Sequence, residues 1–194
     1  MNIEQARFNM IEQQIRTWDV LDGSVLSLLA AVKREDFVPE TYKALAFVDT
    51  EVPLPDGQFM LAPKVEARLL QELAIDQPAT VLVVGAGSGF MAALLAHRAR
   101  QGIPLEDDEK LAALARSNLQ RAGIDNVAVR HMDGSRGLPG EAPFDAILLS
   151  GSVAEVPPTL LAQLKVGGRL AAIVGSPGAR TGEGRSRRSR RGAP

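Results

Sequence analysis

The sequence predicts an α/β protein with a doubly wound, mostly parallel sheet. An apolar, largely β-branched run at residues 81–84 leads into a glycine-rich turn and then into an apolar helical stretch, which is the order strand, turn, helix. Strand-like and helix-like runs then alternate to about residue 174. Because such sheets bind ligands at the carboxyl ends of their strands, the glycine-rich turn is the expected binding site.

Helices and one long irregular segment are expected before this turn. Residues 3–16 are typical of an amphipathic helix, and Asp22 is a good N-cap for a second one. Trp18, between them, is interpreted as a core or interface anchor, with ligand stacking as the alternative. Residues 40–62 show no sustained period, and long loops of this kind are often functional. Pro63 can open the next helix at its first position.

The alternating part of the chain begins with the strand at 81–84. Gly102 and Pro104 are poor residues for the second strand, since proline cannot donate to a ladder and glycine has no side chain to pack. The expected elements are, in order, helix 88–99, strand 103–105, helix 107–122, strands 127–130 and 144–149, helix 157–164 and strand 168–174.

Three glycines, Gly85, Gly87 and Gly89, are spaced by two in the turn. Glycine lets the backbone turn sharply and lets a ligand approach the main chain, while the following helix offers unpaired N–H groups. Phe90 stands where a dinucleotide fingerprint has Gly or Ala, so a mononucleoside-type ligand is favoured. The alternative is a tight turn without a ligand.

Two acidic positions lie where such a fold uses them. Glu106 ends the second strand, where a carboxylate can accept hydrogen bonds from ribose hydroxyls. Asp133 and Gly134 follow the third strand, where an acid could accept from an adenine amino group. The alternatives are a helix-start acid for Glu106 and a simple turn for Asp133 and Gly134. Their order along the alternating pattern favours the ligand interpretation.

Composition excludes several classes of site. The chain of 194 residues suits one domain with a full core, and it has no cysteine, which excludes disulfides, thiolate metal sites and a cysteine nucleophile. The two histidines, His97 and His131, cannot form a histidine metal cluster, so no metal site is predicted. We find no apolar run that approaches a membrane span and no cleavable leader pattern, and we expect a cytoplasmic protein without membrane contact.

Charge divides the chain into an acidic body and a basic tail. Residues 179–194 hold six arginines and one glutamate, which leaves a net charge of −6 on residues 1–178 when the whole chain carries −1. An acidic body argues against an enzyme that tracks nucleic-acid phosphates, and the tail has no aromatic residues for base stacking. The tail, residues 176–194, has the composition of a disordered segment.

Several stretches between residues 7 and 175 together resemble one known family. They are Met10-Ile11-Glu12-Gln13-Gln14-Ile15, Val25-Leu26, Arg34-Glu35-Asp36-Phe37-Val38-Pro39, Ala46-Phe47-Val48-Asp49, Gly57-Gln58, Gly85-Ala86-Gly87-Ser88-Gly89-Phe90, Asn126-Val127, Asp133-Gly134 and Phe144-Asp145-Ala146-Ile147. The family is that of the protein-L-isoaspartate O-methyltransferases, within the S-adenosylmethionine-dependent methyltransferases. The N-terminal stretches discriminate best, because all such methyltransferases share the glycine turn.

The resemblance implies a Rossmann-like sheet of the class I methyltransferase type and methyl transfer from S-adenosylmethionine to isoaspartyl carboxylates in protein repair. Isoaspartyl proteins or peptides would be the partners. Residues 1–62 would form part of the substrate site and 63–175 the cofactor domain. The substrate loop would consist of Gly57, Gln58, Phe59, Met60 and Leu61, and the cofactor site of Gly85, Ala86, Gly87, Ser88, Gly89, Glu106, Asp133 and Gly134.

The sequence differs from the family at several positions that the resemblance connects with function. Family members usually have Thr-Ile-Ser where this chain has Phe59-Met60-Leu61, so the hydroxyl associated with the substrate carboxylate is missing at Leu61. Val83 replaces an acid common in the first strand, and the usual last two strands are expected to be absent, which would leave an apolar sheet edge. The alternatives are therefore a same-fold methyltransferase for another small molecule, or a non-catalytic homologue.

Overall fold

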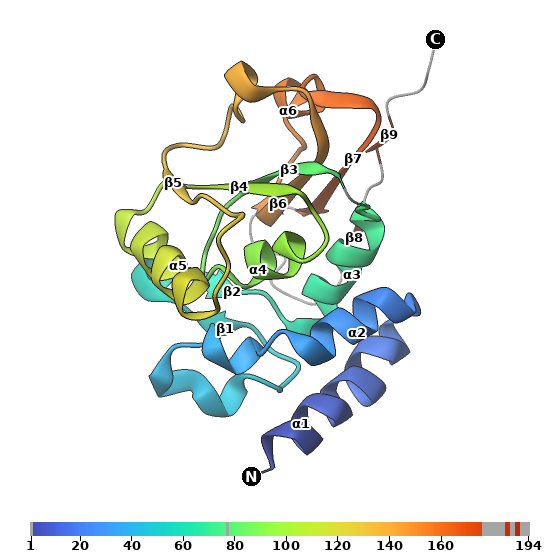
Figure 1. The fold of residues 1–194 in the computed structure, drawn as a ribbon, viewed down its shortest axis with the longest axis vertical. Helices are drawn as coiled ribbons and strands as arrows, with labels where there is room; N and C mark the ends of the chain where they lie inside the picture. Colours follow the sequence, from blue (N-terminus) through green and yellow to red (C-terminus); the bar gives the residue numbers. More distant parts are fainter. Residues whose placement is uncertain (1, 77, 176–184, 187–188, 191–194) are drawn as a thin grey trace.

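The computed structural model describes residues 2–76, 78–175, 185–186 and 189–190, and Figure 1 shows their arrangement. The N-terminal helices α1 and α2, in blue, lie together at one end of the molecule, and α6 lies at the other. The elements before the sheet are α1 (Ile3–Met10), a π turn (Ile11–Ile15), a 3-10 turn (Arg16–Trp18), α2 (Gly23–Ala31), 3-10 turns at Arg34–Asp36 and Glu40–Leu45, β1 (Val52–Pro53), a 3-10 turn (Pro55–Gly57), β2 (Phe59–Met60) and α3 (Pro63–Leu73).

The remaining elements form a sheet with helices against it. They are β3 (Thr80–Val84), α4 (Phe90–Ala96), β4 (Gln101–Glu106), α5 (Glu109–Arg121), β5 (Arg130–His131), a 3-10 turn (Pro139–Glu141), β6 (Phe144–Val153), α6 (Pro158–Leu161), β7 (Leu164–Val174), β8 (Arg185–Ser186) and β9 (Ser189–Arg190). Five strands are parallel, in the order β5-β4-β3-β6-β7, so the chain changes direction of winding between β3 and β6. The predicted α/β fold class is confirmed.

Alternate residues of the strands pack on opposite faces of the sheet. Val81 and Val83 of β3 join the larger hydrophobic cluster, to which α2, α3, α4 and α5 contribute. Leu82 lies in a second cluster with Leu160 of α6. This period of two is what an extended strand imposes, and burial on both faces explains why β3 reads as a continuous apolar run.

Three predicted elements before and beside the glycine turn form largely as expected. Asp22 caps α2 by accepting hydrogen bonds from Ser24 N and Val25 N, and Pro63 is the first residue of α3. The predicted helix 3–16 changes type at Ile11. Met10 and Ile15 are five residues apart and both are buried. A π turn is wider than an α-helical turn, so it places residues five apart on the same side of the helix.

The second and third strands show what glycine and proline do in a ladder. β4 pairs with β3 over five residues despite Gly102 and Pro104, and Gly102 leaves room for Val127, since a Cβ there would lie 3.1 Å from Val127 Cγ2. Proline has no N–H to donate. The strand predicted at 127–130 is accordingly reduced to an isolated bridge at Val127 and the two residues of β5.

The end of the chain corrects one expectation. The helix predicted at 157–164 spans only Pro158–Leu161, and β7 begins at Leu164. The far edge of β7 is not bare, because β8 and β9, of two residues each, pair with it in antiparallel orientation. Such pairing uses main-chain groups, which arginine and serine supply as well as apolar residues do. The rest of the predicted disordered tail lies outside the described residues, and the domain boundaries at residues 62 and 175 stay predictions.

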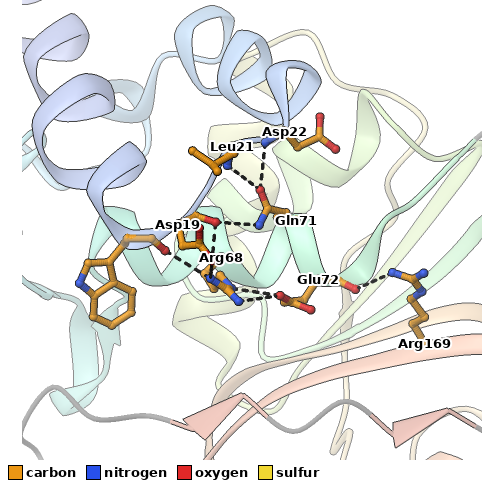
Figure 2. A network of polar contacts seen from close by, with 8 residues as sticks. Asp19, Leu21, Asp22, Arg68, Gln71, Glu72 and Arg169 are labelled. Atoms are coloured by element: carbon orange, nitrogen blue, oxygen red, sulfur yellow. Dashed lines mark hydrogen bonds and ion pairs between the residues drawn. The ribbon is translucent and has the colours of Figure 1, made fainter.

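One helix, α3, links the N-terminal segment to the sheet (Figure 2). Gln71 accepts hydrogen bonds from Leu21 N and Asp22 N over 2.9 and 3.1 Å. Arg68 binds Glu72 on the same helix, and Arg169 of β7 donates to the backbone carbonyl of Glu72 over 3.2 Å. These contacts hold Leu21 and Asp22 on one side of α3 and β7 on the other.

Candidate functional site

The glycine-rich turn lies at the carboxyl end of β3, beside the change in winding. Gly85, Gly87 and Gly89 have φ of +88°, +52° and +87°, and L-residues with a side chain rarely adopt such angles. A Cβ at Gly89 would also lie 3.2 Å from the carbonyl oxygen of Ala115 in α5. The glycines therefore serve both the sharp turn and the close approach of α5.

Between these glycines, Ala86 and Ser88 are buried parts of the turn. The carbonyl oxygen of Ala86 accepts a hydrogen bond from Gly89 N over 2.8 Å. The carbonyl oxygen of Ser88 accepts one from Asn118 Nδ2 of α5 over 2.8 Å. The backbone of the turn is thus held by the same helix that follows β4.

Glu106, the last residue of β4, is directed at the glycine turn. Its buried carboxylate accepts from Gly87 N over 2.9 Å and from Asp108 N over 3.3 Å. The N-cap of α5 is Asp108, which accepts from Lys110 N and Leu111 N. The helix-start interpretation therefore applies to Asp108, and Glu106 remains a carboxylate at the ligand edge of the sheet.

Asp133 and Gly134 lie beyond β5 at the same edge. Asp133 is exposed and accepts from the backbone N and the hydroxyl of Ser135, and the backbone hydrogen bond contributes most to a lowered pKa of the Asp133 carboxyl. A Cβ at Gly134 would lie 2.8 Å from Val84 Cγ1 of β3. Gly134 thus lets the chain pass directly over the strand that leads into the glycine turn, and Asp133 lies next to it.

The irregular segment contains a small hairpin, β1 and β2, that reaches the glycine turn. Leu54 N donates to the carbonyl oxygen of Gln58 over 2.8 Å and closes the hairpin. A Cβ at Gly87 would lie 3.5 Å from Leu54 Cδ1. Asp56 forms an ion pair with Lys110 of α5 over 3.0 Å. The residues just before the predicted substrate loop therefore lie beside the glycine turn, although the two are about 30 residues apart in sequence.

The predicted loop residues face different surroundings. Gly57 and Gln58 are exposed, and the Phe59 side chain is 44% exposed. Met60 is only 4% exposed and packs in the hydrophobic core, and Leu61 is half-buried against it. Phe59 is accordingly the apolar side chain that this loop presents. Val83, the second departure from the family, is a buried core residue of β3 and pairs with Pro104 and Leu148.

Arg34 and Glu66 form a buried ion pair that the sequence did not single out. Arg34 also donates to the carbonyl oxygens of Ala46 and Leu61, over 2.9 and 2.8 Å. Burial raises the pKa of Glu66 to about 7, against the opposing charge of Arg34. Arg34 lies in a stretch that carries the family resemblance, but no local pattern reveals a partner 32 residues away.

Ser150 is a further polar residue at this edge that sequence reasoning missed. The pairing of β6 with β7 shifts register between Leu148 and Ser152, and such bulges often re-aim side chains. A Cβ at Gly85 would lie 3.7 Å from Ser150 Cβ. The serine therefore adjoins the glycine turn where the winding changes direction.

Two hollows in the surface lie away from the glycine turn. A hollow of about 460 Å³ lies beside α5 and residues 123–129, and one of about 330 Å³ lies at the amino ends of β3 and β6. Within the described residues, no group of three or more histidine, cysteine, aspartate or glutamate side chains could hold a metal ion. None of the described helices has the length and hydropathy to span a membrane.

Comparison with known proteins agrees with this arrangement. The family model for Protein-L-isoaspartate(D-aspartate) O-methyltransferase (PCMT) matches residues 5–188. The chain belongs to this family. A protein-L-isoaspartate O-methyltransferase of Koribacter versatilis is 42% identical over 171 residues, covering 88% of this chain and 77% of that protein. Protein-L-isoaspartate O-methyltransferase 1 of Syntrophobacter fumaroxidans is 38% identical over 175 residues, covering 90% and 82%.

Solved structures extend the likeness to the fold. One protein-L-isoaspartate O-methyltransferase structure matches with a TM-score of 0.73 and 25% identity, covering 89% of this chain and 55% of that one. A Plasmodium falciparum protein assigned as a PCMT, solved with S-adenosyl-L-homocysteine, matches with a TM-score of 0.75 and 23% identity over 88% of this chain and 84% of that one. The family resemblance expected from the N-terminal stretches and the glycine turn is confirmed.

Proposed function

We propose that this PCMT family member transfers a methyl group from S-adenosylmethionine to the α-carboxylate of isoaspartyl residues in aged proteins. The observation that carries the proposal is the approach of the β1–β2 hairpin to the glycine turn, where Leu54 lies beside Gly87, together with the ion pair between Asp56 and Lys110 of α5. This contact supports the proposal because the predicted substrate segment would then adjoin the predicted cofactor residues. The new C–O bond would form as the S–CH₃ bond breaks, and S-adenosylhomocysteine would leave.

The residues at the edge of the sheet fit this cofactor. Gly85 and Gly87 are half-buried and, having no Cβ, let a ligand approach the backbone. Glu106 has spare acceptor capacity on both carboxylate oxygens for ribose hydroxyls. Asp133 would accept from the adenine amino group. When bound, S-adenosylmethionine supplies an activated methyl group on a sulfonium.

Orientation is the main task left to the protein. An ionised carboxylate is already a nucleophile at neutral pH, so no general base is needed. Holding the nucleophile in line with the methyl group can supply a large part of the rate. In this chain the segment at 57–61 would bound the isoaspartyl pocket, and no side-chain hydroxyl is available there, since it reads Gly-Gln-Phe-Met-Leu.

The test is methyl transfer to an isoaspartyl peptide, with the same peptide containing normal aspartate as the matched control. We expect turnover with the first peptide alone, and saturable calorimetric binding of S-adenosylmethionine that is lost in Gly87→Val, because valine at φ +52° would be strained and would meet Leu54. Binding without turnover on any acceptor would favour the non-catalytic homologue. Absence of binding by the folded protein would refute the proposal.

A second candidate is methylation of an apolar small molecule, favoured by the exposed ring of Phe59. Turnover of small carboxylic acids, with none of the isoaspartyl peptide, would establish it. Phe59→Ser is the discriminating variant, because a loss of turnover with apolar acceptors alone would assign the ring to their binding.

The setting proposed for this activity is the cytoplasm, with isoaspartyl-containing proteins as partners. A chain without cysteine is compatible with a reducing compartment. Fractionation of cells that express the full chain tests this placement.

A further inference from the structure

Arg34 is a buried cation that contacts backbone from two segments. Its side chain is 1% exposed, and it lies in the 3-10 turn that follows α2. Its Nε donates to the carbonyl oxygen of Ala46 over 2.9 Å, and its Nη2 donates to that of Leu61 over 2.8 Å. A planar guanidinium fixes two such acceptors in one geometry, which a lysine ammonium cannot do.

Glu66, in the first turn of α3, is the partner of this cation. Its side chain is 2% exposed and pairs with Arg34 Nη1. Buried ion pairs contribute little to stability compared with well-packed apolar residues of similar volume. The pair is therefore better explained by the geometry that it imposes on the carbonyl oxygens of Ala46 and Leu61 than by the stability it adds.

The same guanidinium lies against the start of the helix that follows the glycine turn. Arg34 Cζ is 5.2 Å from the ring centroid of Phe90, the first residue of α4, and Phe37 packs on that ring at 5.5 Å between centroids. One side chain thus contacts the end of the hairpin segment, α3 and the beginning of α4.

We propose that Arg34, held by Glu66, is a positioning residue that sets the distance between the substrate segment at 57–61 and the glycine turn. The effect of this role on catalysis depends on the proposed function. Arg34 touches neither reacting group. It acts through the carbonyl of Leu61, the residue that closes the segment.

Other contacts hold α3 in place, so its docking does not depend on this pair. Figure 2 shows Gln71 of α3 bound to the backbone at Leu21 and Asp22, and Glu72 bound by Arg169. Gln71 binds the backbone at Asp19, Leu21 and Asp22 and lies on the same helix as Glu66. Gln71→Leu therefore serves as the control that weakens α3 without touching the Leu61 carbonyl.

The test variant is the double substitution Arg34→Met/Glu66→Leu, which removes both charges together. Methionine can still pack on Phe90, and no unpaired charge is left buried. We expect the variant to fold with a lower melting temperature, because the carbonyl oxygens of Ala46 and Leu61 lose their donors. We also expect amide hydrogen exchange in peptides covering residues 52–62 to be roughly 10-fold faster, because the charged hydrogen bond to Leu61 is lost.

In turnover assays the same variant should raise KM for the isoaspartyl peptide roughly 10-fold and leave the calorimetric affinity for S-adenosylmethionine unchanged. Gln71→Leu should lower thermal stability with native exchange at 52–62 and native KM. If the double variant exchanges and turns over peptide as the native chain does, Arg34 is only structural and the inference is wrong.

Arg34→Lys guards against failure of the double variant to fold. Lysine keeps the charge beside Glu66 but lacks the planar guanidinium that binds the carbonyl oxygens of Ala46 and Leu61. Amide hydrogen exchange at residues 52–62 should therefore become faster while the protein stays folded. Native exchange in this variant would overturn the inference. The exchange measurement needs no turnover, so an inactive native chain would refute the proposed function while the role of Arg34 is still decided.

Discussion

The carboxylate of Glu106 accepts a hydrogen bond from the backbone N–H of Gly87 over 2.9 Å. The contact joins the end of β4 to the turn after β3, and Asp108, two residues on, caps α5. One acid thus orders the glycine turn while its neighbour starts the helix. This separation of roles makes Glu106 the most informative position for testing the cofactor site.

Glu106→Gln should weaken binding of S-adenosylmethionine by about 10-fold, because the amide keeps one acceptor for Gly87 but loses the charge and an acceptor oxygen. Isothermal calorimetry measures this directly. Asp107→Asn, at the exposed neighbouring acid, is the matched control and should bind normally. Equal affinities for the two variants would remove Glu106 from the site.

Substitution of Gly89 by alanine should lower the free energy of unfolding by about 2 kcal/mol or more, from backbone strain and from the 3.2 Å approach to Ala115 O. Gly123→Ala carries the strain alone, since φ is +70° with nothing within 4 Å, and should cost about 1 kcal/mol. Gly140→Ala has neither feature and should be near neutral. Urea unfolding ranks the three, and an inverted order would contradict this account.

Glu66 should make stability depend on pH. Burial raises its pKa from an ordinary 4.5 to about 7 in the folded chain, so between these values the folded state keeps a proton that the unfolded state has lost. Its contribution to stability is therefore complete below pH 4.5 and declines as pH rises to about 7.

The measurement compares urea unfolding of the native chain and Glu66→Gln at pH 4.5, 6 and 8. Glutamine does not titrate, so the stability of the native chain should decline relative to the variant as pH rises. A constant difference between the two proteins across this range would show that Glu66 does not titrate there.

A chain ending at Gly175 should associate more readily than the full chain. It lacks β8 and β9, which pair with Arg169, Leu170, Ile173 and Val174 of β7, and unpaired strand edges promote association. Light scattering over a range of protein concentrations measures the effect. A shortened chain that stays monomeric where the full chain does would show that these short strands do not protect the edge.

Much of the fold could be predicted from the sequence, because it depends on interactions between neighbouring residues. The capping carboxylate of Asp22, Pro63 at the start of α3 and the positive φ of Gly85, Gly87 and Gly89 depend on a few neighbouring residues, so the sequence specifies them. The run at β3 is apolar on both faces because both faces are covered. Short elements were less predictable, since β5 and α6 depend on partners elsewhere in the sheet.

The sequence by itself determined the α/β class, the glycine turn and the family, because periodicity and turn chemistry are properties of contiguous residues. Only the tertiary structure decided that Glu106 and not Asp108 faces Gly87, that Met60 is core while Phe59 is exposed, and that Arg34 pairs with Glu66. Each of these depends on burial or on a partner far along the chain. Such pairings arise when the sheet and helices pack, and no local pattern encodes them.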